Sequence, residues 1–276
     1  GVPHIVSPRG MLVPEMIAGK STLVKRLWIS LQERRGLTTA AAIHVTSEEE
    51  ADGVRRLGLD LAPIRIVGNG VDLPDVSPDA GDIARIWEGI PKGSRVAFLG
   101  RLDWTKGVDL AIDAVVEHPH AQILIAGPDQ IGLRATLEPR LTANGTVPRG
   151  RFIGAVGDTD KWALLAGADV LLAPSLKESF GLAVAEALAI GTPVICTEGV
   201  GAATIIREID ADCVVPRSAR ALATSLASLL ADAPRRAAIA RKARSIMGER
   251  YTWDGIAAQM EEIYAGVHRT NPGRRR

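Results

Sequence analysis

The chain has 276 residues, enough for one large domain or two ordinary ones; 46% are hydrophobic and 24% charged, as in globular proteins. A net charge of +1 and an aromatic content of only 4% argue against a nucleic-acid surface, which needs a basic field and stacking side chains. The sequence contains no apolar run of about 18 residues, so no membrane-spanning helix is expected, and its first residues lack the pattern of a signal peptide.

The first 72 residues alternate between strand and helix patterns. Strands are expected at residues 2–7, 40–46 and 64–67, and helices at 14–36 and 47–58. Ser47 is predicted to cap the second helix, with Glu50 completing a capping box and Gly58 ending the helix. This segment predicts part of an α/β domain.

Residues 73–94 have little pattern and predict a linker with one short helix at 83–87. A second α/β domain is expected over residues 95–250, because apolar runs and helical patterns alternate there. Its six predicted strands lie at 95–99, 122–126, 151–154, 169–173, 194–196 and 212–215. A last helix is expected over 251–268, followed by a disordered basic tail at 269–276.

The two cysteines, Cys196 and Cys213, both lie in apolar runs that predict strands. We expect buried free thiols in a reducing, cytoplasmic compartment, and neither a disulfide nor a metal site. The chain begins at Gly1 without a methionine and in the middle of a pattern, which suggests a fragment or a processed product.

The stretch Ala173–Pro193 has the strand–loop–helix–strand pattern of a parallel sheet. Ligands in such sheets bind where strands end and helices begin. The backbone N–H groups around 180–182 would face an anion there, so a carboxylate such as Glu178 would bind something else, for example sugar or ribose hydroxyls. The alternative is structural: a helix cap for Glu178 and a solvated position for Glu186.

A pair of cations follows the predicted strand at 95–99. Arg101 comes directly after Gly100, and Lys106 precedes Gly107 at the start of a predicted helix over 106–116. An Arg and a Lys at a strand end can neutralise a diphosphate and support its departure. The alternative is two solvated surface charges.

Glu178 and Glu186, with Phe180-Gly181 between them, resemble the E-x7-E signature of retaining, nucleotide-sugar-dependent glycosyltransferases of the GT-B fold, family 4 (glycosyl transferases group 1). The resemblance extends to SPRGML at 7–12, VTSEEEA at 45–51, NGVD at 69–72 and YTWDGIAAQMEEIY at 251–264. Gly68 stands where the family usually has proline. The resemblance implies a complete C-terminal Rossmann-like domain and only the second part of the N-terminal, acceptor-side one.

The resemblance also implies residue roles. Arg101 and Lys106 would hold the diphosphate, Glu178 the donor sugar, and Glu186 the ribose, with no metal or cofactor besides the substrate. The backbone of Phe180, Gly181 and Leu182 would add donors to the diphosphate, and the loop at Val156 would flank the base. On the acceptor side, Arg9 and Gly10 would contact the acceptor or a phosphate; the alternative for Arg9, which the residue alone favours, is a simple loop charge.

The implied reaction moves a sugar from a nucleotide diphosphate sugar to a hydroxyl of a saccharide or lipid-linked acceptor, as in polysaccharide biosynthesis, in the cytoplasm or at the inner face of the membrane. Two alternatives stay open: a nucleotide-sugar 2-epimerase of the same fold, and an inactive nucleotide-sugar-binding remnant. Without the leading part of the first domain, we expect this chain to bind donor, transfer sugar poorly, and self-associate through exposed strand edge.

Overall fold

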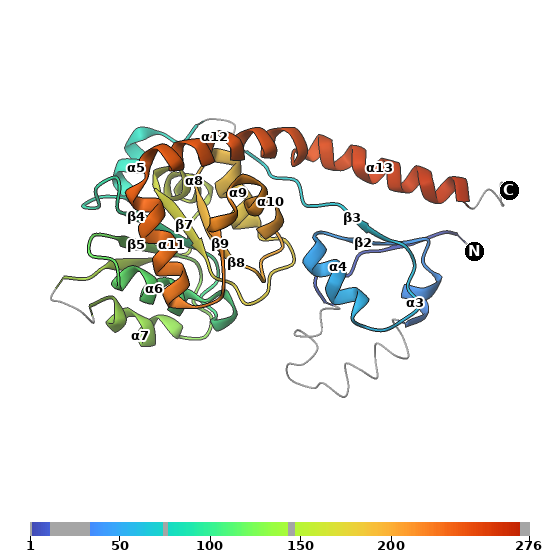
Figure 1. The fold of residues 1–276 in the computed structure, drawn as a ribbon, viewed down its shortest axis with the longest axis horizontal. Helices are drawn as coiled ribbons and strands as arrows, with labels where there is room; N and C mark the ends of the chain where they lie inside the picture. Colours follow the sequence, from blue (N-terminus) through green and yellow to red (C-terminus); the bar gives the residue numbers. More distant parts are fainter. Residues whose placement is uncertain (1, 12–33, 74–76, 143–146, 271–276) are drawn as a thin grey trace. The chain divides into compact units, whose positions relative to one another are not determined.

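The computed structural model describes residues 2–11, 34–73, 77–142 and 147–270 (Figure 1). The chain forms two compact units. Unit 1 comprises Gly1–Gly70, Glu178–Phe180 and Arg250–Arg276, and unit 2 comprises Val71–Lys177 and Gly181–Glu249. No helix in the described ranges is long and apolar enough to cross a membrane.

Unit 1 is built on a small parallel sheet with the strand order β1-β2-β3. Its core gathers apolar side chains from the sheet and from its flanking helices, among them Leu37, Ile43 and Val54. In chain order its elements are β1 (Ile5–Val6), α3 (Arg34–Thr39), β2 (Ala42–Val45), α4 (Glu48–Arg55), β3 (Ile64–Ile66) and α13 (Trp253–Thr270). Most of the helix expected at 14–36 lies outside the described residues.

The predicted capping box at the start of α4 forms only in part. The Ser47 hydroxyl accepts from the Glu50 N–H at 3.1 Å, as expected. The Glu50 carboxylate does not return to the Ser47 N–H; it accepts from the N–H and the hydroxyl of Thr46, both at 2.8 Å, and from the N–H of Gly10. This buried carboxylate therefore joins the loop after β1 to the loop after β2. The helix itself ends at Arg55, before Gly58 takes a left-handed φ of 67°.

Unit 2 contains a six-stranded, all-parallel sheet with the order β6-β5-β4-β7-β8-β9. Its strands are β4 (Arg95–Leu99), β5 (Gln122–Ala126), β6 (Gly150–Gly154), β7 (Val170–Ala173), β8 (Val194–Thr197) and β9 (Val214–Val215). Its longer helices are α5 (Ala80–Ile86), α6 (Val108–Val116), α7 (Leu133–Leu137), α8 (Asp158–Gly167), α9 (Leu182–Ile190), α10 (Ala203–Ile209), α11 (Ala219–Ala231) and α12 (Ala233–Arg250).

Helices cover the central strands of unit 2 in two groups (Figure 1). Helices α6 and α11 pack together and on the sheet, whereas α8 packs with α5 and α9. Strands that are buried on both faces have continuous apolar runs rather than an alternating pattern. The runs in β4, β5 and β7 are of this kind, which is why their positions could be predicted.

The structure corrects several sequence-based expectations in unit 2. Helix α5, expected within a linker, is part of the unit: the Trp87 indole N–H donates to the Leu164 carbonyl of α8 at 3.1 Å. Helix α6 begins at Val108 rather than Lys106, because Gly107 takes a left-handed φ of 70° after a short 3-10 turn, η2 (Trp104–Lys106).

Three smaller differences separate the predicted elements from the observed ones. Helix α7 was not expected. The first half of the strand expected at 212–215 lies in a 3-10 turn, η4 (Ala211–Cys213), because the Asp210 carboxylate caps that turn. Helix α13 continues through Thr270, beyond the predicted start of the tail at 269, and the remaining tail lies outside the described residues. Both cysteines are buried free thiols, as predicted.

Candidate functional site

The sheet of unit 2 reverses its strand order between β4 and β7. The chain runs outward from β4 to β5 and β6 on one side, and from β7 to β8 and β9 on the other. The two central strands are parallel and paired, with Val96 opposite Val170, so their carboxyl ends meet at one edge. In open α/β sheets this reversal point is where ligands bind. The loop with the predicted cations follows β4, and the loop leading to α9 follows β7.

These two loops are joined through backbone groups. The Leu176 N–H donates to the Thr105 carbonyl at 2.6 Å. A side chain at Gly107 would collide with the carbonyl oxygen of Pro174, so only glycine allows this approach. Arg217 bonds to both loops: its Nη2 donates to the Trp104 carbonyl at 3.0 Å, and its Nε donates to the Pro174 carbonyl at 3.3 Å. The loop after β4 therefore has a fixed position relative to the loop after β7.

The end of β8 and the turn that follows it also lie close to the loop after β7. The Thr197 hydroxyl donates to the Ser175 carbonyl at 2.5 Å. A β-carbon on Gly199 would collide with the carbonyl oxygen of Leu176. The close approach at position 199 therefore requires glycine.

The predicted cations lie in the loop after β4. Arg101 is exposed and Lys106 is half-buried. Between them, the Asp103 carboxylate accepts from the Thr105 hydroxyl and N–H, both at 2.7 Å. These bonds lower the pKa of Asp103, burial opposes them, and the charges of Arg101 and Lys106 lower it further. Asp103 therefore stays ionised and caps the short turn, and the loop keeps one net positive charge.

Helix α9 begins without a side-chain cap. Its N-cap is Gly181, with a left-handed φ of 98°, and among the described residues no side chain makes a capping hydrogen bond there. Phe180 is only 5% exposed, so its part in any ligand contact would come from its backbone. The exposed side chain of Leu182 flanks this helix start. The arrangement can bind an anion through backbone N–H groups and the helix dipole.

Glu186 lies in the second turn of α9, which begins at Leu182. Its Oε1 accepts a charged hydrogen bond from Lys161 Nζ of α8 at 2.9 Å. Burial lowers the pKa of Lys161, but the bonds and charges of Glu186 and Asp158 outweigh it and leave the pKa raised. Glu178 is half-buried in the loop four residues before α9.

The remaining donor-side residues lie in neighbouring loops. Val156 is half-buried in the loop from β6 to α8, whose strand is at the edge of the sheet. In the turn after β5, the Asp129 carboxylate accepts from the N–H groups of Leu133 and Arg134, both at 2.9 Å. That carboxylate is used to start α7, which indicates a structural role for Asp129.

The acceptor-side residues Arg9 and Gly10 follow β1 in unit 1. Arg9 has a left-handed φ of 51°, and its Nη1 donates to the Asn69 side-chain oxygen at 2.7 Å. The Gly10 N–H donates to Glu50, as described above. The nearby His44 is buried between the Ser7 hydroxyl at 3.0 Å and the Val67 carbonyl at 2.9 Å, which indicates a structural role.

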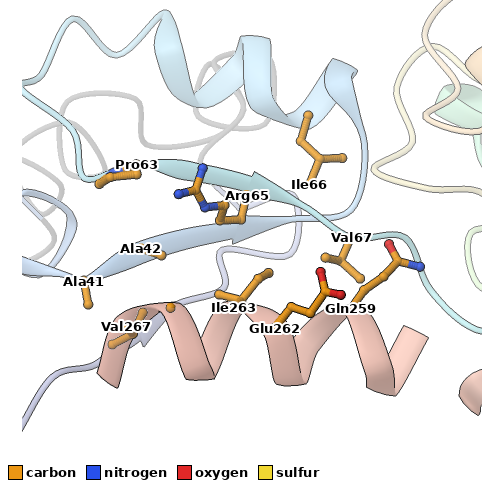
Figure 2. A pocket seen from close by; sticks show the side chains of 11 residues that line it. Ala41, Ala42, Pro63, Arg65, Ile66, Val67, Gln259, Glu262, Ile263 and Val267 are labelled. Atoms are coloured by element: carbon orange, nitrogen blue, oxygen red, sulfur yellow. The ribbon is translucent and has the colours of Figure 1, made fainter. Parts of the chain in front are cut away.

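A cavity of about 900 Å³ lies in unit 1 between the sheet and α13 (Figure 2). Ala42, Val67 and Ile263 give it an apolar wall, while Arg65 and Glu262 add charges at its side (Figure 2). It contains none of the predicted site residues, so it does not define the site. Over the ranges that the structure describes, no group of three or more His, Cys, Asp or Glu could hold a metal ion.

Sequence reasoning missed Lys161, Thr197 and Arg217, which hold site loops or a site carboxylate in place. None of them has a sequence signal, because each acts on an element distant in the chain. Their contacts depend on how the helices and loops meet around the sheet.

Two family models together match most of the chain. Residues 84–246 match the model described as "Glycosyl transferases group 1", and residues 1–70 match "Glycosyl transferase 4-like domain". The D-inositol 3-phosphate glycosyltransferase of Xylanimonas cellulosilytica is 34% identical over 247 residues, 85% of this chain and 58% of that protein. The phosphatidyl-myo-inositol mannosyltransferase of Mycobacterium leprae is 35% identical over 210 residues, 72% and 54% of the two chains. This chain thus spans little more than half the length of these relatives.

Solved structures show the same fold. Anabaena Alr3699/HepE in complex with UDP and glucose superposes with a TM-score of 0.81 at 22% identity, over 96% of this chain and 72% of that one. The sucrose-phosphate synthase of Thermosynechococcus elongatus gives 0.78 at 24% identity, over 97% and 68%. The predicted GT-B fold is confirmed.

Proposed function

Because this chain belongs to the glycosyl transferases group 1 family, we propose that it acts as a retaining glycosyltransferase on a nucleotide diphosphate sugar. The sugar would pass from the diphosphate to an acceptor hydroxyl with its anomeric configuration kept. The observation that supports this most is the reversal point of the unit 2 sheet. There a loop with two cations is fixed beside the loop that leads to the uncapped start of α9.

Arg101 and Lys106 would hold the diphosphate and offset the charge that develops as it departs. The N–H groups at the start of α9 would add uncharged donors. In this proposal no metal ion is needed, because the cations and the helix start supply the positive potential that a divalent ion supplies elsewhere. The Asp103 carboxylate is bonded within its own turn and offsets one of the two positive charges, so the loop keeps one net positive charge.

The carboxylates would recognise hydroxyl groups. Glu186 is on the helix that follows the anion-binding start, and we assign it to the ribose hydroxyls. Glu178 is in the loop before that helix, and we assign it to the donor sugar. Carboxylates accept from hydroxyl donors, so neither role needs a change of protonation. The backbone at Val156 would flank the base.

For the acceptor, the names of the relatives suggest a starting class. Two of them act on inositol-containing acceptors by name, so we propose an inositol phosphate or a lipid-linked inositol, with other saccharides next. Arg9 and Gly10 are the residues we assign to the acceptor or its phosphate. We also propose that the protein works in the cytoplasm, at or near the inner membrane face, which fits its two free thiols.

Binding tests the donor half of the proposal. Thermal unfolding is followed with UDP, GDP and ADP, since a ligand raises stability according to its concentration over Kd. One of them should raise Tm, and Glu186→Gln should weaken that nucleotide, whereas Glu178→Gln should weaken only the corresponding nucleotide sugar. Equal loss for bare nucleotide and nucleotide sugar in both variants would refute the division of roles.

Turnover tests the reaction class. The nucleotide sugar that binds is incubated with and without inositol 3-phosphate, and the anomeric configuration of the product is read by NMR. A transferase needs the acceptor and keeps the donor configuration. A sugar product formed without acceptor would instead favour the 2-epimerase alternative, which no observation in this chain favours. Absence of any nucleotide binding would contradict the proposed function as a whole.

A further inference from the structure

The ion pair between Lys161 and Glu186 joins two helices of unit 2. Lys161 is on α8 and Glu186 on α9, and the Nζ–Oε1 distance is 2.9 Å. Both side chains are 21% exposed. The ammonium also lies 4.5 Å from the ring centroid of Trp162. A lysine has three donors and a long stem, so these contacts restrict both its position and that of the carboxylate.

This pair differs from the other ion pairs of α8. Arg85 and Asp160, for example, are 54% and 38% exposed, and water screens such pairs strongly. Asp158, the second carboxylate near Lys161, is 90% exposed and 3.3 Å away. Glu186 is therefore the main partner of Lys161, and their attraction is screened less than that of a surface pair.

The Lys161 ammonium bonds to Oε1 of Glu186, so a ligand hydroxyl could donate to the second carboxylate oxygen. Glu186 has three side-chain torsions, and without Lys161 its carboxylate would sample several rotamers. A carboxylate that recognises two ribose hydroxyls must be held in one orientation. A neighbouring ammonium also reduces the repulsion between that carboxylate and a nucleotide's phosphates.

We propose that Lys161 is a positioning residue for nucleotide recognition: it fixes Glu186 so that ligands with an intact ribose are preferred over deoxyribose ligands. The inference rests on the proposed function, in which Glu186 accepts from the ribose hydroxyls. Lys161 itself need not touch the nucleotide. Its effect passes through one oxygen of Glu186, which makes the two residues a single unit for binding.

Isothermal calorimetry tests this on the whole chain with UDP, GDP or ADP, whichever binds, and with the 2′-deoxy and 3′-deoxy forms of that nucleotide. The variants are Lys161→Met, Lys161→Arg, Glu186→Gln and the double variant Lys161→Met/Glu186→Gln. Asp158→Asn is the matched control, because it removes the exposed partner of the same lysine. Thermal unfolding without nucleotide checks that each variant is folded.

We expect the wild-type chain to prefer the ribonucleotide by at least about tenfold, the effect of one hydrogen bond to a charged group. Glu186→Gln should abolish this preference, and Lys161→Met should lower it by several-fold. The double variant should lose no more than Glu186→Gln alone, since both changes act on one carboxylate. Lys161→Arg should retain most of the preference, and Asp158→Asn all of it.

The possible outcomes distinguish the positioning role of Lys161 from the ribose-binding role of Glu186. If Glu186→Gln loses the preference and a folded Lys161→Met keeps it, the positioning role is refuted while the ribose role of Glu186 stands. If Glu186→Gln keeps the preference, the proposed role of Glu186 fails, and the role of Lys161 fails with it. Additive losses in the double variant would also refute the inference, because they would show independent action.

Discussion

Removing the two cations after β4 should weaken diphosphate binding unequally. Lys106 is half-buried, so its attraction to a phosphate at about 4 Å is worth up to about 4 kcal/mol at an effective dielectric constant near 20. Arg101 is exposed, where the same attraction approaches about 1 kcal/mol. After desolvation costs we expect about 2–5 kcal/mol for Arg101→Ala/Lys106→Ala, with the larger share from Lys106.

Calorimetry with the nucleoside diphosphate that binds measures this loss, which corresponds to a Kd increase of about 30-fold to several thousand-fold. Titrations at about 50 and about 300 mM salt should show a weaker salt dependence in the double variant, because fewer charges meet the ligand. Arg241→Ala, which removes an exposed cation from α12, is the control. A double variant that binds as tightly as Arg241→Ala would refute the assignment of both cations.

Three further predictions concern the structure around the site. Gly199→Ala should destabilise the chain by about 1–3 kcal/mol and lower Tm by several degrees, because its β-carbon collides with the Leu176 carbonyl. Trp87→Ala should cost about 3–5 kcal/mol in urea unfolding, because a buried, hydrogen-bonded indole is lost. Burial raises the pKa of Cys196 and Cys213 from 9.0 to about 12. The stability of the folded state should therefore fall as the pH rises from about 9 to about 12, because only the unfolded thiols ionise readily in that range. The fall should be less steep in Cys196→Ala/Cys213→Ala.

A control variant or a second measurement checks each of these three predictions. Gly157→Ala meets no atom within 4 Å and should leave Tm unchanged; an equal loss there would reject the collision argument. Trp104→Ala, at a 48% exposed indole, should change stability by about 0.5 kcal/mol or less. If Trp87→Ala is equally mild, α5 is not integral to unit 2. Rapid modification of both thiols in the folded chain at pH 8 would contradict their burial.

The sequence was most informative where local pattern and burial agree. The bounds of β4 and β5 were predicted as the structure has them, because each has an uninterrupted apolar run. Because the ends of these strands were predicted, the loops that follow them could be located in the sequence as well. The string around Glu178 and Glu186 indicated the family, which the comparisons confirm.

What the sequence did not indicate depends on contacts across the sheet. The start of α6 moved because Gly107 lies against Pro174, and that approach is set by the pairing of β4 with β7. Arg217 follows β9 at the edge of the sheet yet holds the central loops, and no spacing rule links these positions. The individual roles of the site residues stay predictions.

The joined loops at the centre of the unit 2 sheet also affect how readily this protein can change its ligand during evolution. Their contacts use mostly main-chain atoms, with glycine at 107 and 199 allowing the close approach. Replacing the exposed side chains of Trp104, Leu176 or Leu182 would therefore alter the surface offered to a ligand without moving the frame beneath it. Changes of ligand preference are therefore expected at these three positions, whereas a substitution at either glycine is expected to disturb the loops themselves.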